Sequence, residues 1–312
     1  AYGGETQQAI GTGDEGVIVT DKTPFYAEMG GQAGDIGVIF AQNAKAEVVD
    51  TKKTGDGIYL HHVKVCEGSF SVGDEVTLEV NKKNRMAVCR NHSATHLLHK
   101  ALKEVLGVHV AQAGSEVNAK HLRFDFSHFE AMTKDEIKLA EKTVNDAILE
   151  AMPIVIKELP IEEAKKLGAE AQFGEKYGDV VRVVTMGDYS AEFCGGTHLK
   201  NTSEAGLFKI LSESGVAAGT RRIEAITGAA VLDYINAKDE VIQNAADVLK
   251  SNVTEVVSRA EKVMGEVKEY GRQIEQMRAK LAQSAVGDIL NNAKEVKGIK
   301  VITAYYEDMG MN

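Results

Sequence analysis

The chain has 312 residues, with 46 acidic against 36 basic side chains and a formal net charge of −10. This acidic balance counts against a general nucleic-acid-binding protein, because neutralising phosphates requires clustered Lys and Arg. No apolar run approaches the roughly 20 residues that span a bilayer, so we expect a soluble protein without membrane contact. The length predicts two or three domains. Three scattered cysteines and the absence of a secretory signal indicate a reducing, cytoplasmic setting. Because the chain begins without Met, we expect a fragment.

Residues 1–88 contain short runs rich in Val and Ile, separated by turns of Gly and Asp. Regularly spaced strands of this kind are typical of a small barrel or sandwich. The predicted strands are 16–20, 37–40, 46–49, 59–65 and 75–80.

The segment 24–37, PFYAEMGGQAGDIG, contains four glycines within eight residues. One interpretation is a bulged corner of the barrel that uses Gly for positive φ. The other is a backbone that a ligand approaches closely, lined by Glu28, Gln32 and Asp35. Composition alone favours the corner.

Residues 91–100, NHSATHLLHK, lack Gly and Pro and predict a helix. His92 and His96 lie four apart, which places both imidazoles on one helix face, one turn apart. A metalloprotease is disfavoured, because H-E-x-x-H requires Glu where this chain has Ser93. His99 lies one turn further and could act as a ligand, but a histidine in this position more often packs or donates a hydrogen bond.

Two basic groups offer either solvated faces or phosphate contacts. They are Lys82, Lys83, Arg85 and Arg90 before the histidine helix, and Arg221 and Arg222 in AGTRR.

Residues 89–228 predict an α+β domain with helices packed on a mostly antiparallel sheet. Thr133 and Glu136 form a capping box that starts a helix, and Pro153 stops it. The predicted strands are 108–117 with Gln112 facing one side, 123–126, 154–156, 180–184, 207–211 and 222–226.

The loop 194–198, CGGTH, places Cys194 and His198 four apart around two glycines, which make a tight loop more favourable than a helix. Together with His92 and His96 they supply the N and S ligands of one tetrahedral Zn²⁺. Cys66 and Cys89 have no spaced partners, and we expect both to be buried small side chains.

Beyond residue 228 the pattern becomes helical, and we predict a helical linker at 229–288. Residues 289–312 predict the start of a further domain, with a strand at 299–304. An apolar heptad seam requires a partner helix, which is either the preceding helix folded back as a hairpin or another subunit. We favour the hairpin and keep a homodimer open. The seam consists of Val256, Ala260, Val263, Val267, Tyr270, Ile274, Met277 and Leu281.

Three motifs carry a family resemblance: NHSATHLLHKAL at 91–102, RFDFSH at 123–128 and CGGTHLKNTSEAGLFKILSESGVAAGTRRIEAITG at 194–228. With them the chain resembles the alanyl-tRNA synthetase family over nearly its whole length. Free-standing alanyl-tRNA editing proteins are similar over the barrel, residues 1–88, and the editing core, residues 89–228, but the long heptad helix favours a synthetase piece. The resemblance implies a translation-factor-like β-barrel, a zinc-dependent editing domain and a helical linker.

The resemblance also implies a function: removal of serine, and also glycine, wrongly attached to tRNA(Ala). His92, His96, Cys194 and His198 match the family's zinc ligands, and Thr95, Gln112 and Arg221 match its editing-site positions. The parent enzyme ligates alanine to tRNA(Ala) with ATP and Mg²⁺ in an aminoacylation domain that these 312 residues do not include. Met29 departs from the small polar residue common in the family's Gly-rich stretch. Four protein ligands nearly close a zinc shell, so we expect the metal to position the substrate rather than to activate water.

Overall fold

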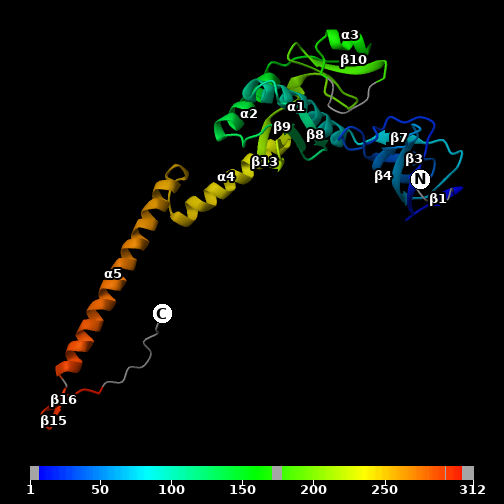
Figure 1. The fold of residues 1–312 in the computed structure, drawn as a ribbon. Helices are drawn as coiled ribbons and strands as arrows, with labels where there is room; N and C mark the ends of the chain where they lie inside the picture. Colours follow the sequence, from blue (N-terminus) through cyan, green and yellow to red (C-terminus); the bar gives the residue numbers. More distant parts are fainter. Residues whose placement is uncertain (1–6, 171–177, 292, 304–312) are drawn as a thin grey trace. The chain divides into compact units, whose positions relative to one another are not determined.

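Seven short strands make up the first part of the chain in the computed structural model, which describes residues 7–170, 178–291 and 293–303 (Figure 1). Five of these strands form an antiparallel sheet in the order β2-β5-β4-β3-β7, and β1 pairs with β6. Alternating side chains of β4 and β5 are buried in the hydrophobic core of this region: Ala46, Val48, Val63 and Val65. The strands are β1 (Ala9–Gly11), β2 (Glu15–Ile18), β3 (Gly37–Ala41), β4 (Ala44–Lys53), β5 (Tyr59–Glu67), β6 (Ser69–Ser71) and β7 (Thr77–Val80).

The predicted closed barrel is not formed among the described residues. Closure requires the two edge strands of a sheet to hydrogen-bond to each other. In the part of the chain that the structure describes, β2 pairs with β5 alone and β7 with β3 alone. Both edges are four-residue strands, and short strands of this kind limit pairing at a sheet edge. The predicted strands themselves are present, in an open sheet.

The long helix α1 (Lys82–Leu106) begins at the N-cap Asn81, whose side chain accepts the backbone N–H of Asn84. Its middle is buried on all sides, and Leu97, Leu98 and Leu102 are fully buried with Phe124 and Phe126. The phenylalanines come from a four-stranded antiparallel sheet, β13-β14-β9-β8, against which α1 packs. Its strands are β8 (Gln112–Val117), β9 (Leu122–Ser127), β13 (Phe208–Ala217) and β14 (Thr220–Thr227).

Helix α2 (Lys134–Leu149) packs against α1 and β13 and begins with the predicted capping box. Thr133 and Glu136 satisfy each other's backbone N–H groups, as the sequence predicted. A single sheet was predicted for this region, but the structure has two. The second is β10-β11-β12, formed by β10 (Ile154–Pro160), β11 (Val180–Met186) and β12 (Ser190–Phe193) with α3 (Ile161–Lys166) after β10. Strands β10, β11 and β12 pair in chain order before the chain returns to β13 through the 3₁₀ turn η1 (Thr202–Ala205).

The chain forms two compact units, residues 1–234 and 235–312, each with most of its contacts inside itself. The second unit contains most of α4 (Ala229–Leu249), the 3₁₀ turn η2 (Val253–Glu255), α5 (Val256–Asn291), β15 (Lys294–Val296) and β16 (Ile299–Val301). The predicted strand 299–304 is therefore shorter, and Ala304 lies outside the described residues. Within those residues, no helix is long and apolar enough to cross a membrane.

The hairpin predicted for the heptad seam is not formed within the described part of this unit. Five seam residues of α5 are between 52% and 70% exposed, whereas a helix folded back along α5 would cover them. They are Val267, Tyr270, Ile274, Met277 and Leu281. Pairing with another subunit stays a prediction.

Candidate metal centre

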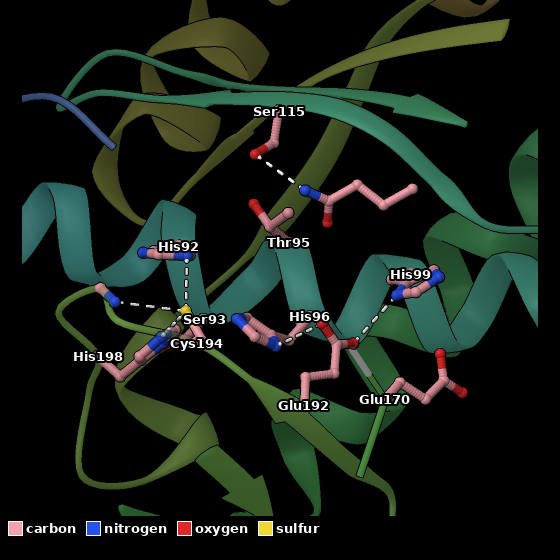
Figure 2. A network of polar contacts seen from close by, with 12 residues as sticks. His92, Ser93, Thr95, His96, His99, Ser115, Glu170, Glu192, Cys194 and His198 are labelled. Carbon is pink, nitrogen blue, oxygen red and sulfur yellow. Dashed lines mark hydrogen bonds and ion pairs between the residues drawn. The ribbon is translucent and has the colours of Figure 1, made fainter. Parts of the chain in front are cut away.

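The four predicted ligand residues lie together although they come from two distant segments (Figure 2). Helix α1 presents His92 and His96 one turn apart, and the loop that follows β12 brings Cys194 and His198 beside them. One ligand atom from each residue lies within 4.8 Å of the others. Cys194 Sγ is 3.4 Å from His92 Nε2 and 3.3 Å from His198 Nε2.

This donor set fits a metal ion. A tetrahedral zinc with bonds of about 2.0–2.3 Å holds neighbouring ligand atoms roughly 3.3–3.8 Å apart, and both sulfur–nitrogen distances, 3.4 and 3.3 Å, fall in that range. Three of the residues are buried and His198 is half-buried. Imidazole and thiolate together suit Zn²⁺ more than Mg²⁺ or Ca²⁺, which prefer oxygen. The cluster could therefore hold a metal ion.

The charge of the cluster favours the ligand form of Cys194. Burial disfavours a thiolate, but the positive charge of His92 and His96, with hydrogen bonds from His198 and His92, lowers the pKa of Cys194 well below its usual value. The pKa of His198 is lowered to about 3, by burial first and then by the charge on His92. A thiolate and a neutral imidazole are the states in which these side chains bind a metal.

Each imidazole of the cluster has a partner on its other nitrogen, Nδ1. Such partners fix which ring nitrogen carries the proton and orient the ring toward a metal. Two of these contacts are hydrogen bonds, from Nδ1 to Gln32 Oε1 at 2.7 Å for His92 and to Ser93 Oγ at 3.1 Å for His198. The third, 3.0 Å from His96 Nδ1 to Glu192 Oε2, is an ion pair without hydrogen-bond geometry.

Glu192, in β12, lies between His96 and His99 and contacts both rings (Figure 2). His99 lies outside the cluster and its Nδ1 is 3.1 Å from Glu192 Oε1, which is the hydrogen-bonding role expected for it. Burial would raise the pKa of Glu192, but the adjacent His96 and His99 hold it well below its usual value. For His96, burial is outweighed by Glu192 and Cys194, so its pKa is raised to about 10.

The backbone of the loop 194–198 passes very close to the ring of His92 and is not helical. A Cβ on Gly196 would lie 2.0 Å from Cε1 of His92, so only glycine fits there. Arg182 of β11 holds the loop from its other side, where Nη1 donates to the carbonyls of Cys194 at 2.6 Å and Gly196 at 2.8 Å. Met29 covers the neighbouring Gly195, with its Cε 3.0 Å from where a Cβ would lie.

The two regions around this cluster match known families separately. Residues 1–84 match the family described as tRNA synthetases class II (A), and residues 181–224, which contain the cysteine loop, match the threonyl and alanyl tRNA synthetase second additional domain. An alanine–tRNA ligase of Acetivibrio thermocellus is 53% identical over 96% of this chain. The chain belongs to the alanyl-tRNA synthetase family.

Two further family members are similarly close. Alanine–tRNA ligase 1 of Lachnoclostridium phytofermentans is 50% identical over 98% of the chain, and the alanine–tRNA ligase of Bacillus velezensis is 50% identical over 96%. The chain spans about a third of the length of these curated relatives, 34% to 35%.

The three residues for which the resemblance predicts an editing role, Thr95, Gln112 and Arg221, come from α1, β8 and β14. In the sheet, Gln112 of β8 and Arg221 of β14 pair with Phe126 of β9 from its two sides. Gln112, Phe126 and Arg221 therefore form one row across the face of the sheet that α1 covers. The Thr95 hydroxyl donates to the Asn91 carbonyl of its own helix at 2.8 Å. Gln112 Nε2 has only a long contact to Ser115 Oγ, at 3.3 Å.

The side chain of Arg221 is not free to bind a ligand, because it is already in an ion pair. Its guanidinium is held by Glu213 of the neighbouring strand β13 in a two-pronged ion pair, at 2.5 and 2.9 Å. Arg222 pairs in the same way with Asp125 at 2.7 and 2.8 Å, and Arg85 of the other basic group binds Asp35. These arginines therefore have internal partners, whereas Lys82 and Lys83 are exposed.

Sequence reasoning missed three contributors to the cluster. Ser93 served only to exclude a protease motif, Arg182 was one residue of a predicted strand, and Glu192 was not singled out. Glu192 carried a signal, because strand periodicity places it on the same face as Cys194, two residues later. The prediction for Cys66 was wrong: it is exposed, since it lies on the outer face of β5, while Cys89 is buried as expected.

A cavity of about 500 Å³ lies between α1 and the β10-β11-β12 sheet. His99 and Glu192 line it with Lys100 and Lys157, but none of the four cluster residues does. The cavity therefore adjoins Glu192, which contacts the cluster, and does not reach the four cluster residues themselves.

Proposed function

We propose that this chain is the proofreading region of an alanyl-tRNA synthetase, which hydrolyses the ester of Ser-tRNA(Ala), and also of Gly-tRNA(Ala), in the cytoplasm. The observation that supports it is the convergence of three imidazoles and one thiol within 4.8 Å. Two of the imidazoles, those of His92 and His96, come from the helix that also carries Thr95. The reaction would take place at the tRNA acceptor end. Activation of alanine with ATP and Mg²⁺ belongs to regions of the longer relatives outside this chain.

His92, His96, Cys194 and His198 would hold one Zn²⁺. When bound, this ion would hold the substrate's amine and hydroxyl as a template. Four protein ligands leave little room for a metal-bound water, so positioning is the role that the residues favour.

Thr95 and Gln112 would recognise the serine hydroxyl. A hydroxyl has one donor and two acceptor sites, and the donor of Thr95 is already used on the Asn91 carbonyl. Thr95 can therefore only accept, and it suits a substrate hydroxyl as donor. Alanine would leave such buried polar groups unpaired, which is the stronger form of discrimination between small substrates. Arg221 would reach a terminal phosphate or carbonyl only by exchanging its partner Glu213.

The test is deacylation of Ser-tRNA(Ala) against Ala-tRNA(Ala) by the whole chain, with and without a metal chelator. We expect faster loss of serine, inhibition by the chelator and recovery with Zn²⁺. Cys194→Ala should lower the rate at least 100-fold while the fold is kept, because it removes the only thiolate of the cluster. Cys66→Ala, on the exposed face of β5, is the matched control.

The alternatives give other outcomes. A non-catalytic tRNA-binding or dimerisation module would leave Ser-tRNA(Ala) intact at the uncatalysed rate, with or without Cys194. A zinc-stabilised structural domain would unfold cooperatively on chelation, whereas an editing site on a preformed core should lose activity first. A free-standing editor acting in trans would show the same hydrolysis, and is distinguished by whether the gene product includes an aminoacylation domain.

A further inference from the structure

Gln32 belongs to the glycine-rich segment 24–37, and its side-chain amide contacts the metal-ligand cluster. It is 1% exposed, and all of its polar atoms are used. Oε1 lies 2.7 Å from His92 Nδ1 and accepts the backbone N–H of Thr197 at 2.8 Å. Nε2 donates to the Thr197 hydroxyl at 3.0 Å. One amide therefore contacts both segments that carry the cluster.

These contacts determine which ring nitrogen of His92 carries the proton in the neutral form. The Thr197 backbone N–H can only donate, so the atom of Gln32 that meets it must be the amide oxygen. His92 Nδ1 faces the same oxygen and must therefore carry the ring proton. In the neutral ring, which is the form that binds a metal, the lone pair is then on Nε2, 3.4 Å from Cys194 Sγ.

The backbone on both sides of Gln32 is docked on β8. Gly31 O accepts the Val117 N–H at 2.8 Å, and the Ala33 N–H donates to Val117 O at 2.9 Å. A Cβ on Gly31 would lie 2.2 Å from Ser115 O, and its φ is +80°. The glycine thus serves close approach of this segment to β8, where the sequence had favoured a bulged corner.

A second anchor joins the same segment to α1. The Asp35 carboxylate is 3% exposed and accepts Arg85 Nε at 2.7 Å and the Tyr26 backbone N–H at 2.5 Å. Arg85 also donates to the Pro24 carbonyl at 3.0 Å. With a docking contact on each side, the position of Gln32 is set by the fold rather than by a free loop.

We propose that Gln32 is a positioning residue of the metal centre: it fixes the tautomer of His92 and ties the 194–198 loop to α1. The inference rests on the proposed function, to which it adds that the N-terminal β region completes the metal site. Groups that hold the second nitrogen of a metal-binding histidine typically change metal affinity or activity by roughly 10- to 100-fold.

The test compares Gln32→Leu, which removes the acceptor at similar size, with Gln32→Glu, which keeps it. Thr23→Ala is the matched control, since it removes a hydrogen bond of the same region, to His61 at 2.8 Å, away from the cluster. Zn²⁺ affinity is measured on the whole chain by competition with a coloured chelator, and the thiolate-to-metal absorption of Co²⁺ reports ligation by Cys194.

We expect a roughly 10- to 100-fold loss of Zn²⁺ affinity in Gln32→Leu and a weaker, altered Co²⁺ spectrum. Gln32→Glu should stay within a few-fold of the unsubstituted chain, as should Thr23→Ala. Should Gln32→Leu lose native circular dichroism, Gln32→Met, unbranched and apolar, takes its place with the same expectation. Equal affinity of the apolar variant and the unsubstituted chain overturns this inference alone, and so does an equal loss in Gln32→Glu. Failure of the unsubstituted chain to bind Zn²⁺ overturns the proposed zinc function as well.

Discussion

Two glycines follow Cys194, and they differ in what they permit. A side chain at 196 would overlap the ring of His92 and the Gln32 amide, both of which are held by other contacts. A side chain at 195 would meet only the terminal methyl of Met29, which is 54% exposed and can move.

Gly196→Ala should therefore displace His92 and lower Zn²⁺ affinity by at least 10-fold, with a loss of about 1–3 kcal/mol in the free energy of unfolding from overpacking. Gly195→Ala is the control and should leave affinity within a few-fold. Metal competition and urea unfolding measure the two effects. Equal behaviour of the two variants would contradict the role given to position 196.

Glu192 links the cluster to pH. In the metal-free protein the pKa of His96 is raised from 6.5 to about 10, so its contribution to stability is complete below pH 6.5 and is lost as pH rises toward 10. Glu192 has a lowered pKa, so its contribution is present above about pH 4.5 and is lost on acidification. Cys194, also with a lowered pKa, acts in the opposite sense to His96 at alkaline pH, because its contribution grows toward pH 9.

Glu192→Gln should weaken the His96 effect, because Glu192 is the largest contributor that raises the His96 pKa, while His92 and His198 still lower the pKa of Cys194. We expect the unfolding free energy of the metal-free variant to fall less, or to rise more, between pH 6.5 and 9.5 than that of the unsubstituted chain. Urea titrations at the two pH values, after removal of metal with a chelator, measure this difference. Parallel pH profiles for the two proteins would argue against the Glu192–His96 pair.

At the scale of elements, α1 combines a structural and a chemical role. Its leucines pack in the main core, while one face carries His92 and His96, and its first turn receives the glycine-rich segment through Arg85. Helix α2 and the four-stranded sheet hold α1 from other directions, so the geometry of the cluster depends on elements that contribute no ligand.

The cap of α2 gives a test of that dependence. Thr133→Ala removes the hydroxyl that accepts the Glu136 N–H, and should cost about 1 kcal/mol of stability, while Thr133→Ser should cost little. Because the change is exposed and local, deacylation and Zn²⁺ affinity should not change. Urea unfolding measures the first effect, and a loss of zinc affinity at full folding would show tighter coupling of α2 to the site than we infer.

At the scale of the whole molecule, the first unit contains the complete candidate site, and the second presents an exposed apolar seam on α5. A seam with a heptad period and no cover among the described residues favours a helix of a second subunit as its partner.

Ile274→Glu places a charge in the middle of this seam and should shift the chain from dimer to monomer in sedimentation equilibrium. Gln276→Glu, on the same turn but outside the seam, should leave the dimer unchanged. A monomeric unsubstituted chain at the same concentrations would rule out this use of α5.

Local patterns determined much of this protein from sequence. Alternating Val and Ile predicted the strands, Thr133 and Glu136 predicted the start of α2, and the four-residue spacings of His92 with His96 and of Cys194 with His198 predicted which side chains would cluster. Each of these signals depends on neighbours within a turn or a strand, which the sequence contains directly.

Tertiary structure alone decided the rest, because it depends on residues far apart in the chain. Among the residues that the structure describes, β2 and β7 do not pair with each other, so the sheet is open, and the strands of residues 89–228 divide into two sheets. Gln32, Ser93, Glu192 and Arg182 acquire their roles only once the glycine-rich segment, α1 and the second sheet meet around the cluster. Nothing in the local sequence of these four residues specifies the partner atom, since hydrogen-bonding side chains become specific only through the geometry that folding imposes.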